Sequence, residues 1–205
     1  MTPVTEPVLD GIKELVNIGI GRAAGSLNAL TGHHVTLHVP DVRISKVEDL
    51  SEDISLPNPS FSVVNQDYSG TFVGTTVLMF PEKSAESLFF LLTGENERTQ
   101  NNDELWQMTL LEVGNIIVNA VMGSITNILG KRIEFHLPEY REDSLDHLIG
   151  SPRFADSKYV IAAHAEFSVE EQNIKGEILL ILADQSIDIL ATSINEKMGV
   201  VKSVN

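Results

Sequence analysis

The chain has 205 residues, 42% of them apolar, and its 14 basic and 29 acidic residues give a formal net charge of −15. This composition supports one sizeable core, whereas nucleic-acid binding would need clustered Lys and Arg. The lack of cysteine excludes disulfides, thiolate zinc sites and cysteine nucleophiles. The first residues carry no basic patch or long apolar segment, and no apolar run approaches the roughly 20 residues of a membrane span, so we expect a cytoplasmic protein.

A long amphipathic helix is predicted between Thr5 and Gly32. Thr5, Glu6 and Pro7 suit the start of a helix, and Gly32 suits its end. Apolar residues recur at steps of three and four, which places them on one side of the helix and predicts that they face the core. They are Leu9, Ile12, Val16, Ile20, Ala23, Leu27 and Leu30. The same pattern returns from about Asp103 to Gly130.

Three strands and a shorter amphipathic helix are expected after each long helix, because alternating or continuous apolar runs follow there. In the first half the strands are predicted at 35–39, 61–66 and 71–80, and the helix at 82–92. In the second half the strands are predicted at 133–137, 159–167 and 174–182, and the helix at 184–198 with Gly199 as its stop. Residues 51–60 and 139–153 are predicted as loops over a sheet edge, and 94–103 as a polar joint.

The two halves match one another. A shift of 98 residues places identical residues on Glu14, Asn17, Ile18, Gly25, Ser26, Gly32, His38 and Pro40, and a shift of 102 places Gly74 on Gly176. Matches at a constant offset indicate an internal duplication. We therefore expect a single domain over residues 1–205, made of two repeats at about 5–95 and 103–199.

The candidate chemistry lies on the long helices. Asp10, Glu14, Asn17 and Gly21 follow one another at steps of four, three and four, so they form one stripe, about 120° from the apolar face by helical periodicity. Asn and Gly are costly inside a helix. If Glu-x-x-Asn occurred only once, Glu14 and Asn17 would be interpreted as ordinary surface residues, and the glycines as positions that let the helix lie close to a strand. The duplication favours function instead.

The second helix repeats the pair as Glu112 and Asn115, and in both halves a proline follows the Asn after 22 intervening residues. The run Asp10-x3-Glu14-x2-Asn17-x22-Pro40 resembles the signature of the CheC, CheX and FliY chemotaxis phosphatases, and the chain is most similar to a CheC-like protein. The resemblance implies an α/β (α+β) class: a pseudo-twofold duplicated CheC-like fold with two long helices packed on a mixed, mostly antiparallel six-stranded sheet. It also implies hydrolysis of the aspartyl phosphate of a CheY-like response regulator.

The resemblance further implies roles for the paired residues. Asn17 and Asn115 would orient the attacking water, and Glu14 and Glu112 would contact a basic residue of the regulator, in the family a lysine. No cofactor or metal is expected on this chain, because Mg²⁺ would be supplied by the regulator. Asp10 is either an accessory residue or a solvated carboxylate favoured near a helix start. The second copy has Met108 in place of Asp10 and Asn119 in place of Gly21, which predicts a weaker second site.

Two other functions remain open at this point. One is an adaptor with little or no hydrolysis that binds a response regulator or the deamidase CheD. The other is a structural part of the flagellar switch, as in FliM, whose middle domain lacks the Glu and Asn pair; retention of both pairs argues against this. His33, His34, His38 and His136 do not have the spacing of metal ligands, so a structural role is expected for them.

Overall fold

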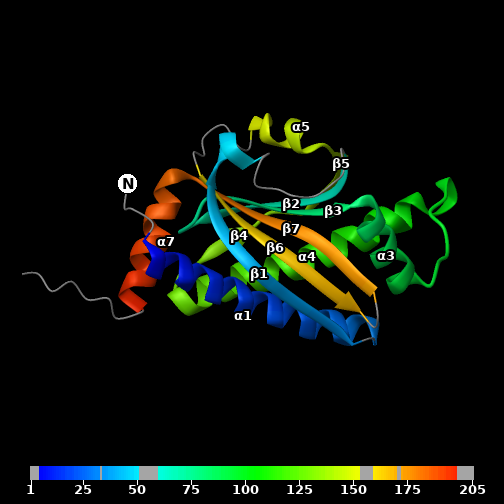
Figure 1. Ribbon diagram of the computed structural model, residues 1–205, viewed down its shortest axis with the longest axis horizontal. Coiled ribbons are helices and arrows are strands. Elements are labelled where there is room, and N and C mark those ends of the chain that lie inside the picture. The colour runs from blue at the N-terminus through cyan, green and yellow to red at the C-terminus, as the bar shows by residue number, and fades with distance from the viewer. Residues whose placement is uncertain (1–4, 33, 51–59, 153–158, 170–171, 198–205) are drawn as a thin grey trace, which may run out of the picture.

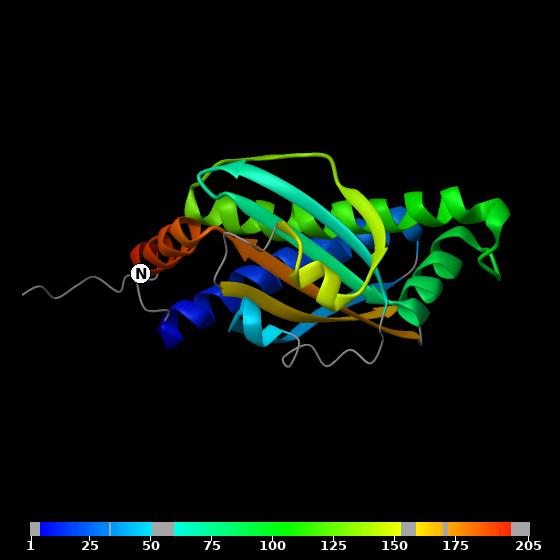
Figure 2. The ribbon, with the colours of Figure 1, turned by 90° about the horizontal axis from the view of Figure 1, so that it is seen from above.

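The computed structural model describes residues 5–32, 34–50, 60–152, 159–169 and 172–197. Figure 1 shows a sheet with two long helices, α1 (Glu6–Thr31) and α4 (Asp103–Leu129), against one face. The short helix α5 (Leu145–Ile149) lies over the other face, as Figure 2 also shows. The shorter helices α3 (Glu82–Thr93) and α7 (Asp184–Lys197) lie near opposite ends of the long-helix layer (Figure 1). The described residues also include two 3-10 turns, η1 (Val47–Asp49) and η2 (Gln100–Asn102).

Both long helices begin and end close to the predicted residues. Thr5 is extended and precedes the first turn of α1, which carries Pro7. Gly32 closes α1 with a φ of 70° and donates its N–H to the Asn28 carbonyl, and Gly130 closes α4 with a φ of 67°. Left-handed backbone of this kind favours glycine, because a β-carbon would be strained there. The two helix stops read from the sequence are therefore confirmed.

Helix α4 contains a longer apolar stretch than was predicted. By length and hydropathy the segment Gln100–Leu129 would also suit a membrane span, whereas we expected no such stretch. Half of its apolar window is buried inside the fold, and twelve residues of α4 are buried. A core helix of a folded domain meets the same criteria, so its packing explains its composition.

The sheet contains seven described strands in the order β1-β6-β7-β3-β2-β4, with β5 also paired to β2. The strands are β1 (Val35–Lys46), β2 (Phe61–Gly70), β3 (Gly74–Pro81), β4 (Ile133–Phe135), β5 (Glu139–Asp143), β6 (Tyr159–Val169) and β7 (Gln172–Leu182). Every described pairing is antiparallel. The fold class is confirmed, but among the described residues the sheet is antiparallel rather than mixed and has seven strands rather than six.

Prolines at the two edges of the sheet explain the differences from the predicted strands. Strand β1 is an edge strand and continues beyond Pro40, with a register shift between His38 and Asp41. At the other edge, β4 ends before Pro138 and β5 begins after it. Proline lacks the N–H that an inner ladder needs, and edge strands and bulges tolerate it. Residues 139–153 are therefore not one loop, because they include β5 and α5.

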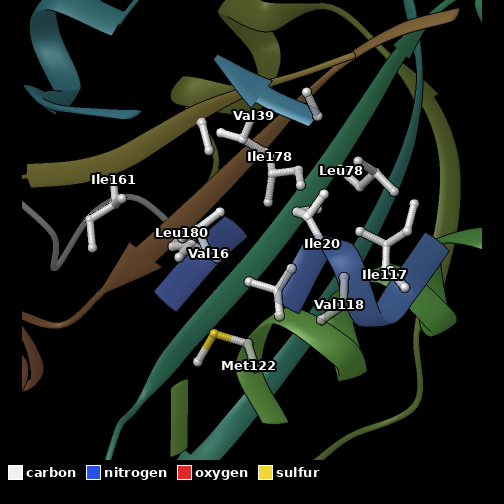
Figure 3. Close-up of a cluster of buried hydrophobic side chains, with 14 of the residues drawn as sticks. Val16, Ile20, Val39, Leu78, Ile117, Val118, Met122, Ile161, Ile178 and Leu180 are labelled. Carbon is white, nitrogen blue, oxygen red and sulfur yellow. The ribbon is translucent and has the colours of Figure 1, made fainter. Parts of the chain in front are cut away.

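The main core lies between the long helices and the sheet. Figure 3 shows Val16 and Ile20 of α1, Ile117 and Met122 of α4, and Leu78 of β3 in one cluster of buried side chains. The prediction of the buried α1 face holds from Ile12 to Leu27. At its end it is wrong, because the side chain of Leu30 is 56% exposed. A second, smaller cluster lies on the other face of the sheet and includes Leu50 and Leu148.

The pairing of the two halves is reciprocal. The first strand after α1, β1, pairs with β6 of the second half, and the strands after α4, β4 and β5, pair with β2 of the first half. The central pair, β3 and β7, joins the halves. Each half therefore completes the sheet of the other. The stop predicted at Gly199 and the loop at 51–59 lie outside the described residues.

Candidate functional site

The first stripe lies on the solvent side of α1. Asp10, Glu14 and Gly21 are exposed and Asn17 is half-buried, whereas Val16 and Ile20 of the same helix are buried in the core. The core residues hold one face of the helix against the sheet, so the other face is presented outward. Glu14 and Asn17 are one turn apart and can therefore contact the same partner.

The second stripe has the same placement on α4, with one added contact. Glu112 is exposed and Asn115 is half-buried, whereas Val113, Ile117 and Val118 of the same helix are buried. Asn119 donates its side-chain N–H to Asn115 Oδ1 at 2.6 Å. Gly21 stands at the equivalent position of α1, so it offers no such donor to Asn17. The carboxamide at the second site is therefore held by its own helix.

The two long helices cross closely at Gly19. A β-carbon there would lie 2.5 Å from the Cα of Val121, so only glycine fits. Arg22 of α1 donates to Ser124 Oγ of α4 at 3.0 Å across the same contact. A β-carbon at Gly21 would meet no atom within 4 Å. Gly19 therefore allows close packing, as one interpretation of the sequence expected, but its neighbour is a helix rather than a strand. Gly21 does not serve this purpose.

An apolar groove adjoins each stripe. The first groove has a volume of about 480 Å³ and lies between the beginning of α1, the end of α4 and the end of α7; Asp10 and Glu14 line it. The second groove has a volume of about 420 Å³ and lies between the beginning of α4, the end of α1 and the end of α3; Met108 and Glu112 line it. The beginning of each long helix therefore lies beside the end of the other. Neither groove could be predicted from the sequence, because the walls of each come from segments that are distant along the chain.

No metal site accompanies the stripes in the described part of the chain. Across residues 5–32, 34–50, 60–152, 159–169 and 172–197, no cluster of three or more His, Asp or Glu side chains could hold an ion. His38 and His136 are both exposed, near opposite edges of the sheet, and His33 lies outside the described residues. The chemistry that the stripes offer is therefore that of a carboxylate and a carboxamide, which can accept and donate hydrogen bonds and pair with a cation.

The fold is that of the CheC, CheX and FliY group, which FliM middle domains share. No family model matches the chain. It superposes on FliY of Thermotoga maritima with a TM-score of 0.78 and 22% identity, covering 96% of this chain and 100% of that one. The middle domain of FliM from H. pylori superposes with a TM-score of 0.61 and 16% identity, covering 93% of this chain and 99% of that one. CheX from Desulfovibrio desulfuricans superposes with a TM-score of 0.52 and 14% identity, covering 82% of this chain and 99% of that one. The resemblance found in the sequence is thus confirmed at the level of the fold.

Proposed function

We propose that the protein hydrolyses the aspartyl phosphate of a CheY-like response regulator in chemotaxis. The observation that carries this proposal is that α1 and α4 each present a Glu and an Asn, one turn apart, on the side that faces away from the sheet. A fold alone does not define an activity, and FliM has the same fold. The repeated pair is what favours catalysis over a structural role.

The proposed mechanism needs little activation of the reactants. An aspartyl phosphate is a reactive mixed anhydride, so hydrolysis mainly requires a water held in line with phosphorus. The Asn17 carbonyl oxygen accepts a hydrogen bond from that water and orients it. The water oxygen bonds to phosphorus while the bond to the aspartyl oxygen breaks, the aspartate leaves as a carboxylate, and the water proton passes to phosphate or solvent.

The remaining groups position the partner. The Glu14 carboxylate binds a basic side chain of the regulator through a charge-assisted hydrogen bond, which fixes α1 over the phosphate. The regulator supplies the Mg²⁺ that neutralises the phosphoryl oxygens. Glu112 and Asn115 repeat these roles on α4. There Met108 removes one carboxylate and Asn119 engages Asn115, so the second site is the weaker of the two.

Turnover separates this proposal from the alternatives. With a tenfold excess of phosphorylated regulator over protein and Mg²⁺ held constant, we expect phosphoaspartate decay to run through many equivalents per protein molecule. An adaptor for a regulator or for CheD would change the decay of at most one or two equivalents. A flagellar-switch component like FliM would leave the decay rate at that of the regulator alone, and that result would refute the proposal.

A further inference from the structure

The two grooves occupy equivalent places in the two halves. A shift of 98 residues relates Ile128 of the first groove to Leu30 of the second, and the same shift relates Glu14 to Glu112. In each groove the Glu of the proposed site stands at the rim. An occupant of either groove would therefore lie within one helical turn of the corresponding Asn.

The first groove combines an apolar floor with a negative rim. Leu15 and Leu129 are buried within it, and Ile18 and Ile128 are partly exposed to it. Asp10 and Glu14 are exposed on one side, and Lys197 is the single cation among the described residues that line it. Two carboxylates against one ammonium favour an occupant that brings an additional positive charge.

The second groove has one carboxylate on its rim instead of two. Met108 replaces Asp10 and is 61% exposed, and Leu30 and Leu105 are 56% and 42% exposed. Glu112 is the only carboxylate among the described residues that line it. The two grooves therefore occupy equivalent places but differ in the number of carboxylates available to a basic side chain.

We propose that the first groove binds a segment of the phosphorylated regulator that presents an apolar side chain next to a lysine or arginine. The apolar side chain enters between α1, α4 and α7, and the basic side chain pairs with Asp10 and Glu14. This inference rests on the proposed function and adds a docking surface to it. The second groove binds the same segment less tightly, because it retains one carboxylate of the two.

Steady-state kinetics of single-groove variants test the proposal. In an Asn115→Ala background, where only the first site acts, Ile128→Asn is expected to raise KM for the phosphorylated regulator by about tenfold, because one buried apolar contact is lost. We expect kcat to stay within twofold. The matched control in the same background is Leu30→Asn, the equivalent change in the second groove, which should leave KM unchanged. In an Asn17→Ala background the two changes should exchange their effects.

The charge at the rim is tested separately with Asp10→Asn, an exposed change that does not depend on core packing. KM should rise about threefold at low salt, and the dependence of KM on salt should weaken, because an exposed charge pair is screened by ions. Unfolding midpoints show whether each variant is folded. If Asp10→Asn left KM and its salt dependence unchanged, the basic residue of the proposed occupant would be wrong.

The outcomes distinguish this inference from the function on which it rests. Failure of the wild-type protein to accelerate decay would end both. Normal turnover with an unchanged KM in Ile128→Asn would overturn the docking surface alone. If deletion of residues 198–205 lowered KM, the occupant of the groove would be the chain's own C-terminal segment. If Ile128→Asn altered a monomer–dimer equilibrium, the occupant would be a second copy of the chain. Either result would also overturn the proposal.

Discussion

Alanine at both Asn17 and Asn115 is expected to reduce the acceleration of phosphoaspartate decay by about 10²-fold. Alanine has no carbonyl oxygen on its side chain, so the attacking water would no longer be oriented. The fold should persist, because both positions lie on the outer sides of α1 and α4 and alanine favours a helix more than asparagine does. The measurement is the rate of phosphoaspartate loss at constant Mg²⁺.

Single variants and a control refine this result. Asn17→Ala should lose more activity than Asn115→Ala, because the second site has Met108 at its start and its Asn115 already accepts a hydrogen bond from Asn119. Asn127→Ala is the matched control, since Asn127 is exposed on α4 but lies two turns or more beyond the stripe. A double variant as active as the wild-type protein would assign the water-positioning role elsewhere.

Replacement of His164 by alanine is expected to lower the free energy of unfolding by about 3 kcal/mol at neutral pH. His164 of β6 lies opposite Glu177 of β7, and its Nδ1 is 2.6 Å from Glu177 Oε1. The Glu177 side chain is only 8% exposed. Removing the imidazole therefore leaves a buried carboxylate without its partner. Urea unfolding followed by the fluorescence of the single, buried Trp106 measures the loss.

The loss of stability caused by His164→Ala should be larger at high pH than at low pH. Burial raises the pKa of Glu177, and the hydrogen bond from His164 opposes that shift. A carboxyl group with a raised folded-state pKa contributes stability below its unfolded pKa and loses that contribution as the pH rises through the folded pKa. His164→Ala/Glu177→Gln should therefore be more stable than His164→Ala at pH 8, and the gap should close near the unfolded pKa of about 4.3.

His147 provides the matched control for this experiment. Its Nδ1 is 2.7 Å from Asp143 Oδ1, a spacing like that of the His164 pair, but the His147 side chain is 80% exposed. Asp143 also keeps a 2.8 Å contact with Arg141 when His147 is lost. His147→Ala should cost less than about 1 kcal/mol. The Asp143 side chain is 7% exposed and thus as buried as that of Glu177, so the two sites differ in the partners that the carboxylate keeps. Equal losses from the two histidine variants would show that loss of the partner of Glu177 does not determine the effect.

The helices and the exposed side of α1 could be read from the sequence because the signals there are local. The apolar period and the closing glycines, Gly32 and Gly130, depend only on neighbouring residues. Strand β1 was predicted too short because Pro40 reads as a strand end, and only the sheet order shows that this strand lies at an edge. The short helix α5 was missed because five residues with a Ser144 cap give little periodicity.

What the sequence did not reveal arises from contacts between distant segments. The first groove needs Ile128 and Ile194 to come beside α1, and no local pattern places them there. The pairing of His164 with Glu177 follows from the β6–β7 register, in which Val169 faces Gln172, and both strands were predicted shorter than they are. Close approach at Gly19 was expected against a strand, but the neighbour is α4. Tertiary packing decides each of these features.

Carboxylate footprinting is the most direct test of whether the outward side of α1 and α4 meets the aspartyl phosphate. The regulator would be held in its activated form with beryllofluoride and Mg²⁺, and exposed carboxylates would be labelled with a carbodiimide and an amine. Labelling of Glu14 and Glu112 should fall several-fold on complex formation, while Asp146 of α5, exposed on the opposite side of the sheet, should be labelled as in the free protein. Protection of Asp146 with unchanged labelling of Glu14 and Glu112 would show that the regulator binds the wrong side of the molecule for the proposed chemistry.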